Sequence, residues 1–232
     1  MEPIHIQSFV AASPEKVWRQ LLERPEVVLD ALPVTAWPEP REERAPARLS
    51  VPWPIGGDAP ATALEITLDP ISAGTRVEVR HDGWPDGPGI EDVFAGHFAG
   101  WLQALAALGL LVESDKDARA STAQLSRTGR YFASVEVPAS ADAAFRALTD
   151  PRVLPQWSAG ALSDAAVTDR IEGRYARWAL SAAPGGAARE LVVILRPTPR
   201  GTHCALAEYG VTDRSASSRW PKMLEHLAQF LR

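Results

Sequence analysis

Two segments of this sequence carry the same apolar pattern, GHFAGWLQALAAL at residues 96–108 and RWPKMLEHLAQFL at residues 219–231. When Trp101 is aligned with Trp220, the leucines that follow also coincide, at a constant offset of 119 residues. Apolar side chains that recur every three to four residues form one face of a helix. Each segment is therefore predicted to be a helix whose apolar face must be covered.

The match continues towards the N-terminus at a second offset. LEITLDPISAGT at residues 64–75 aligns with LVVILRPTPRGT at residues 191–202, and Ser13 aligns with Ser140, all at an offset of 127. The change of offset places eight additional residues in the first copy, in a loop expected around GWPDGPGIEDVFAG. Because a match over several elements indicates duplication, we interpret the chain as two copies of a unit of about 110 residues.

Composition is consistent with two globular domains. The chain has 232 residues and 46% hydrophobic content, so each half can bury a core. We predict a first domain at residues 1–114, a polar linker at 115–129 and a second domain at 130–232.

Several classes of function find no support in the sequence. The net charge of −5 argues against nucleic-acid binding, which relies on clustered positive charge. The longest apolar run has nine residues, against about 20 needed to span a bilayer, so no membrane insertion is expected. The motifs GxGxxG, HExxH and GxSxG are absent and the histidines lack metal-binding spacing, so we predict no cofactor and no metal. The single cysteine suits a reducing cytoplasm, the predicted location.

Each copy has the same expected order of elements. An alternating strand, at residues 5–11 or 131–137, precedes a short helix that Ser13 or Ser140 can cap. Period-two segments such as TRVEVRH and THCALAEY, separated by Pro and Gly turns, predict an antiparallel meander. The long helix comes last, with about 20 residues in the first copy, and only the apolar face of the sheet is large enough to cover it. The sequence thus predicts an α+β fold.

The run TRVEVRHDGWPDG followed by AGHFAGWLQALAAL resembles the C-terminal part of the activator of heat-shock protein 90 ATPase homologue-like family. This family lies within the SRPBCC (START and Bet v 1-related) superfamily. The stretch SPEKVW at residues 13–18 is similar to the opening of the first helix in that domain. The resemblance implies two tandem helix-grip domains, each a curved antiparallel sheet around a long C-terminal helix. In superfamily members the cavity between sheet and helix often accepts hydrophobic ligands.

The two copies depart from each other at the expected site. The second copy has Glu208 where the first has His81, and Trp157 resembles the usual family tryptophan. At that place the first copy has Ala31, and its nearest tryptophan is Trp37. The two sites are therefore not expected to bind the same molecule equally well.

His81 and Glu208 are the candidate orienting or acid–base groups. In TRVEVRH, Val77, Val79 and His81 alternate onto one face, and Glu208 ends the equivalent row. If Glu208 were buried without a cation, desolvation would raise its pKa and allow it to donate a proton. The alternative is that both residues lie at the rim of the sheet and contact water or cap a helix.

Tryptophan is unusually frequent, with eight residues against three tyrosines and six phenylalanines. Indole rings suit a cavity for an aromatic ligand, but helical spacing also explains Trp101 and Trp220 as ordinary core residues. Cys204 is interpreted as a small core hydrophobe. The predicted ligand-binding residues are Trp37, Trp53, His81, Trp84, Phe98, Trp101, Trp157, Trp178, Glu208 and Trp220.

Three functions are open at this stage. The preferred one is binding of a small hydrophobic or aromatic molecule between sheet and helix. The second is an enzyme of cyclase, dehydratase or hydrolase type with His81 or Glu208 as acid or base, although no nucleophile–base pair is visible. The third is a chaperone-cofactor-like interaction module, which the family name implies; the sequence identifies no protein partner.

Overall fold

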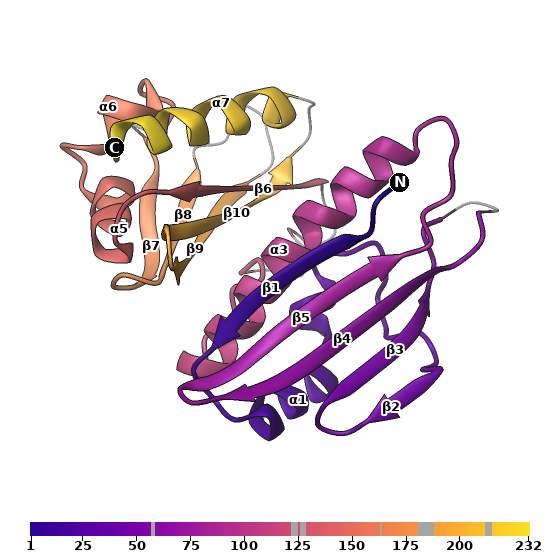
Figure 1. Ribbon diagram of the computed structural model, residues 1–232. Coiled ribbons are helices and arrows are strands. Elements are labelled where there is room, and N and C mark those ends of the chain that lie inside the picture. The colour runs from indigo at the N-terminus through magenta and orange to yellow at the C-terminus, as the bar shows by residue number, and fades with distance from the viewer. Residues whose placement is uncertain (57–58, 122–124, 126–128, 163, 181–187, 212–214) are drawn as a thin grey trace. The chain divides into compact units, whose positions relative to one another are not determined.

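The computed structural model describes residues 1–56, 59–121, 125, 129–162, 164–180, 188–211 and 215–232. The chain divides into two compact units, Met1–Asp117 and Ala118–Arg232. Figure 1 shows a sheet and a long helix in each unit. Each unit therefore has the elements to build a core of its own.

The first unit is one antiparallel sheet with helices on one face. Its elements are β1 (Ile4–Val10), α1 (Pro14–Glu23), α2 (Pro25–Leu29), β2 (Glu42–Arg44), β3 (Arg48–Trp53), β4 (Thr62–Ile71), β5 (Gly74–Asp82) and α3 (Ile90–Ser114). The strands pair in the order β1-β5-β4-β3-β2. Helix α3 packs on the inner face, where the rings of Trp101 and Trp53 lie 5.3 Å apart by centroid.

The second unit repeats this order. Its elements are β6 (Gly129–Val137), α5 (Ala141–Thr149), α6 (Leu154–Ser158), β7 (Ala166–Ile171), β8 (Tyr175–Leu180), β9 (Arg189–Thr198), β10 (Gly201–Val211) and α7 (Ser215–Phe230). The strands pair in the order β6-β10-β9-β8-β7. The predicted α+β fold, with an antiparallel sheet gripping a C-terminal helix in each half, is confirmed.

The pairing register follows the offset seen in the sequence. Ile4 of β1 pairs with His81 of β5, and Tyr131 of β6 pairs with Glu208 of β10. Both members of the second pair lie 127 positions after their counterparts. His81 and Glu208 therefore occupy the same place in their sheets.

The predicted helix caps are also present. The Ser13 hydroxyl accepts a hydrogen bond from the backbone of Lys16 at 3.4 Å, and the Ser140 hydroxyl accepts one from Ala143 at 3.2 Å. Each serine satisfies a backbone N–H that the first turn of a helix leaves without a partner. Both short helices therefore begin where the sequence predicts.

A Gly-Thr pair fixes the start of β5. Gly74 has a φ of +152°, and a Cβ added there would lie 2.2 Å from the carbonyl oxygen of Val10. The Thr75 hydroxyl donates at 2.7 Å to a backbone carbonyl just before α1. Gly201 and Thr202 make the same contacts at the start of β10. Only glycine allows the two chain segments to approach so closely.

Helix α3 is longer than predicted. It has 25 residues and begins at Ile90, eleven positions before Trp101, whereas α7 begins five positions before Trp220. Most of the additional residues of the first copy thus extend the helix, and only residues 83–89 form a loop. By length and composition α3 could cross a membrane, but 72% of its most apolar window is buried, as is typical of a core helix.

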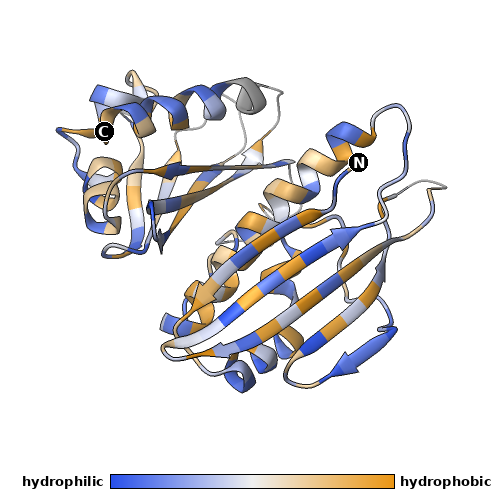
Figure 2. Ribbon diagram, in the orientation of Figure 1, coloured by the Kyte–Doolittle hydropathy of each residue, from blue (hydrophilic) through white to orange (hydrophobic). Residues whose placement is uncertain are grey.

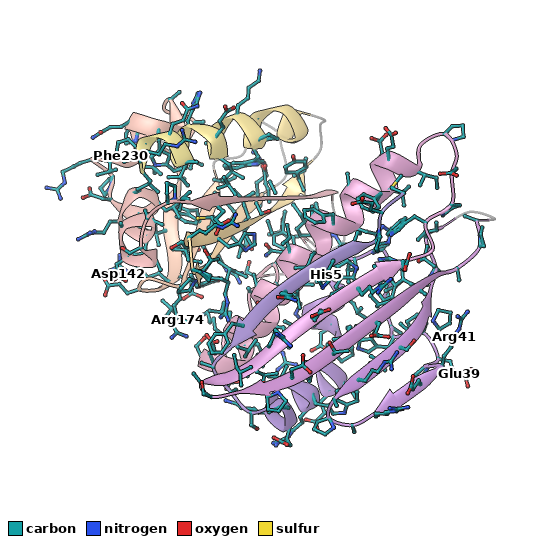
Figure 3. The ribbon with its side chains drawn as sticks, in the orientation of Figure 1. His5, Glu39, Arg41, Asp142, Arg174 and Phe230 are labelled. Atoms are coloured by element: carbon teal, nitrogen blue, oxygen red, sulfur yellow. The ribbon has the colours of Figure 1, made fainter. Side chains whose placement is uncertain are left out.

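The two faces of the first sheet differ in polarity. Val77, Val79 and His81 are buried on the inner face of β5, as predicted. The outer face carries polar contacts, such as the 2.8 Å hydrogen bond between His5 and Glu78 (Figure 3). Figure 2 shows the resulting alternation of polar and apolar residues along the strands. The inner face alone therefore positions a site against α3.

The second sheet has buried residues on both faces. On β10 the inner row contains Cys204, Leu206 and Glu208, as predicted, and all three are buried. The outer row is also buried and consists of Ala205, Ala207 and Tyr209. The outer row of β10 is thus apolar, whereas the outer row of β5 is polar.

The second unit begins with a segment bound to its own sheet. The Ser121 backbone and hydroxyl donate to Glu190 of β9, and the Arg177 guanidinium donates to the Arg119 carbonyl at 2.6 Å. The linker predicted at residues 115–129 lies partly outside the described residues. Its boundaries stay a prediction.

Candidate functional site

His81 lies at the centre of the first unit, on the inner face of β5. Its side chain is 0% exposed, so the alternative placement at a wet rim of the sheet is wrong. The Trp101 indole donates to His81 Nδ1 at 3.3 Å, and His81 Nε2 lies 2.6 Å from Oγ1 of Thr62. Because an indole N–H can only donate, Nδ1 carries no proton and Nε2–H donates to Thr62. Both ring nitrogens are therefore engaged.

Burial keeps this imidazole neutral. The pKa of His81 is lowered to about 3, mainly by desolvation and also by the neighbouring His97, while Asp82 opposes the change. A neutral ring agrees with the hydrogen bonds, which place one proton on the ring. At pH 7 His81 is thus an uncharged connector between α3 and the sheet.

Aromatic rings surround His81. The centroids of Trp84, His97 and Trp53 lie 4.4, 5.4 and 6.0 Å from its own. Two further rings contact these neighbours: Trp37 lies 6.0 Å from Trp53, and Phe94 lies 5.1 Å from Trp84. We name the whole group the aromatic cluster; it consists of Trp37, Trp53, His81, Trp84, Phe94, His97 and Trp101.

Sequence reasoning missed two members of the aromatic cluster, Phe94 and His97, of which only His97 is polar. His97 lies on α3 one turn before Trp101, and its side chain is 4% exposed. Its Nδ1–H donates to the Val93 carbonyl at 2.8 Å, and within the described part of the chain Nε2 has no hydrogen-bond partner. Desolvation lowers the pKa of His97, so this ring is neutral too. Its four-residue spacing from Trp101 was the available signal, because that spacing places both on one helix face.

Trp53 provides the second unpaired polar group. Its side chain is 0% exposed, and among the residues that the structure describes none accepts a hydrogen bond from Nε1. The Trp37 indole donates instead to the Leu21 carbonyl at 3.1 Å, and the Trp84 indole to the His81 carbonyl at 3.0 Å. The aromatic cluster thus contains both satisfied and unsatisfied polar atoms.

The equivalent centre of the second unit is ionic. Glu208 is 0% exposed, and both of its oxygens are engaged. Arg189 donates to Oε1, with its Nε at 2.8 Å, and Arg219 donates to Oε2 at 2.7 Å. The Trp220 indole also donates to Oε2, as Trp101 does to His81 in the first unit. Two guanidinium groups thus accompany the carboxylate, and the condition for a proton-donating Glu208, burial without a cation, is not met.

The other residues that the sequence predicts to bind a ligand lie in different environments. The Trp157 indole donates to the Ala147 carbonyl at 2.8 Å, which parallels the bond of Trp37 to the first helix. Trp178 is buried in the core of the second unit, and its Nε1 has no partner within the described ranges. Phe98 is 42% exposed and makes no ring contact with the aromatic cluster among those found in the described residues.

Cys204 is a core residue of the second unit, as predicted. It is buried among apolar side chains, and desolvation raises the pKa of its thiol to about 12. A thiol with this pKa is not a thiolate at neutral pH and is a poor nucleophile. In the part of the chain that the structure describes, no group of three or more His, Cys, Asp or Glu side chains could hold a metal ion.

The fold and the two centres define a protein with two helix-grip units, one with a neutral aromatic centre and one with an ionic centre. No protein-family profile matches the sequence, and comparison with curated proteins gives no significant match. Several solved structures, however, have a backbone fold similar to that of this chain. DynU16, from the dynemicin biosynthetic locus, is 16% identical, covers 100% of this chain and 96% of its own, and has a TM-score of 0.44.

Two further structures show the same kind of likeness. The di-domain ARO/CYC StfQ of the steffimycin biosynthetic pathway is 14% identical and has a TM-score of 0.36, with 98% of this chain and 97% of StfQ covered. A protein of Mesorhizobium loti is 20% identical and has a TM-score of 0.38; the match covers 44% of this chain and 96% of that protein.

Proposed function

We propose that the first unit binds one small, neutral aromatic molecule between its sheet and α3, at the aromatic cluster. The observation that carries this proposal is that the described residues offer no partner to two buried polar atoms, Trp53 Nε1 and His97 Nε2, whose rings contact that of His81. An unsatisfied buried donor or acceptor costs about 1–3 kcal/mol, and a ligand that pairs with it would recover this free energy.

The chemistry of the aromatic cluster supports an uncharged ligand. Indole and imidazole rings offer flat apolar faces, and burial keeps both imidazoles neutral. A charged ligand would lose its hydration without gaining a counter-ion from these seven residues. The resemblance to the SRPBCC superfamily supports the same reading, because its members often accept hydrophobic ligands between sheet and helix.

The acid–base alternative receives less support from the geometry. Both nitrogens of His81 and both oxygens of Glu208 are engaged by neighbouring groups. A catalytic acid or base needs a free position within hydrogen-bond reach of its substrate. The enzyme and the interaction-module alternatives remain predictions.

A thermal-shift and fluorescence titration with neutral bicyclic aromatics tests the proposal. A ligand at a hundred times its Kd adds about 2.7 kcal/mol to the free energy of unfolding. We expect stabilisation by naphthalene derivatives, with 2-naphthoate as a charged probe that binds more weakly.

Two matched variants locate the site. Trp84→Leu and Trp157→Leu each remove a buried indole that donates to a backbone carbonyl, in the first and second unit respectively. We expect only Trp84→Leu to weaken binding, by about tenfold. Absence of binding by every neutral probe, or an equal loss in both variants, would contradict the proposal.

A further inference from the structure

The polar atoms of the aromatic cluster that have no hydrogen-bond partner among the described residues indicate which polar groups a ligand needs. His97 Nδ1 faces the carbonyl of Val93, which can only accept, so the single proton of the neutral ring lies on Nδ1. His97 Nε2 is therefore a bare acceptor. It is buried, and the described residues supply it with no donor.

Trp53 offers the opposite group. An indole Nε1 carries a hydrogen and has no lone pair to accept with, so it can only donate. Thr62 accepts from His81 and donates to the Trp53 backbone carbonyl at 3.0 Å, which leaves the indole N–H outside this chain of bonds. The Trp53 ring contacts those of His81 and Trp101, so this donor, for which the described residues offer no acceptor, belongs to a ring of the aromatic cluster.

The other polar atoms of the aromatic cluster have partners. The indoles of Trp37, Trp84 and Trp101 donate to a backbone carbonyl or to His81, and both His81 nitrogens are engaged. Among these seven residues, as far as the structure describes them, one acceptor and one donor are left open. Both belong to rings that contact His81.

We infer that the ligand of the first unit is an uncharged hydroxyaromatic ketone or a compound of the same pattern, whose hydroxyl donates to His97 Nε2 and whose carbonyl accepts from Trp53 Nε1. This inference rests on the proposed binding function and assigns an orienting role to His97. A purely hydrocarbon ligand would leave both polar atoms unsatisfied, whereas a ligand with this pattern satisfies both.

Four probes separate the two hydrogen bonds without any mutation. They are 6-acetyl-2-naphthol, its methyl ether, 2-acetylnaphthalene and 2-naphthol, and their Kd values are measured by calorimetry on the full chain. We expect 6-acetyl-2-naphthol to bind about tenfold more tightly than the methyl ether, which cannot donate. The same factor is expected over 2-naphthol, which lacks the carbonyl.

Variants then assign each preference to a residue. His97→Phe is expected to abolish the preference for hydroxyl over methoxy and to keep the preference for the acetyl group, and Trp53→Phe is expected to do the reverse. Trp178→Phe is the matched control, because it removes from the second unit a buried indole N–H that likewise has no acceptor among the described residues. It should leave both preferences unchanged.

The outcomes distinguish the two proposals. If no probe binds the native protein, the proposed binding function fails, and the inference fails with it. If all four probes bind equally well, the binding function stands and the inference is overturned. A hydroxyl preference that persists in a folded His97→Phe protein also overturns it.

Discussion

His81 and Glu208 show how one position in a fold can be satisfied in two chemical ways. Both receive an indole hydrogen bond from the long helix, and both are fully buried. A neutral imidazole needs only two hydrogen-bond partners, whereas a buried carboxylate needs cations, here Arg189 and Arg219. The different residue at this position is therefore accompanied by different partners in each unit.

The buried His81 makes stability depend on pH. Its pKa is about 3 in the folded protein against an ordinary value of 6.5, so below pH 6.5 only the unfolded chain binds the proton. Stability from this residue is complete above pH 6.5 and falls as the pH drops towards 3. Between pH 7.5 and 5 we expect the native protein to lose about 2 kcal/mol more than His81→Gln, measured by urea unfolding.

The exposed His5 supplies the control for this comparison. His5→Gln changes an exposed residue whose side chain contacts Glu78 on the outer face of the sheet, so the pH profile of this variant should follow that of the native protein. Parallel profiles for the native protein and His81→Gln would contradict the prediction.

At the scale of elements, the Gly74-Thr75 pair fixes where β5 begins relative to β1 and α1. Replacing Gly74 by alanine would force a Cβ onto the Val10 carbonyl and strain a positive φ. We expect a loss of about 1–3 kcal/mol in the free energy of unfolding. The control is Gly96→Ala on the exposed side of α3, where a Cβ meets nothing within 4 Å and helix propensity favours alanine by about 1 kcal/mol.

Urea unfolding measures the free energy of unfolding of both variants. We expect it to fall in Gly74→Ala and to rise in Gly96→Ala. If the Gly74→Ala protein were as stable as the native one, the backbone around Gly74 could relax to accept a Cβ. The close approach to Val10 would then not explain why the Gly-Thr pair recurs at Gly201 and Thr202.

Elements differ in how far the sequence predicts them. The long helices, the capped short helices and the main strands are predicted because each has a periodic pattern or a capping residue. The elements α2, α6 and β2 have between three and five residues, too few for a period to appear. The start of α3 is predicted too late because the Pro and Gly residues before Ile90 indicate a loop, although the helix continues up to it.

At the scale of the molecule, two units with the same strand order carry different centres. The first has neutral rings with one donor and one acceptor that no described residue pairs, and the second has a carboxylate held by two arginines. A neutral aromatic ligand in the second unit would displace those charged contacts, which is costly. We expect calorimetry with 6-acetyl-2-naphthol to give one binding site per chain. Two equivalent sites would contradict this asymmetry.

The sequence by itself determined the repeated order of elements, the apolar faces of the two long helices and the place of His81 and Glu208 at the ends of equivalent rows. These follow from periodicity and spacing, which are local properties of the chain. Only the tertiary structure decided that Arg189 and Arg219 neutralise Glu208, that Trp101 fixes the tautomer of His81, and that His97 and Trp53 keep open polar atoms. These contacts join side chains of different elements, and hydrogen bonding and desolvation depend on which groups meet in space.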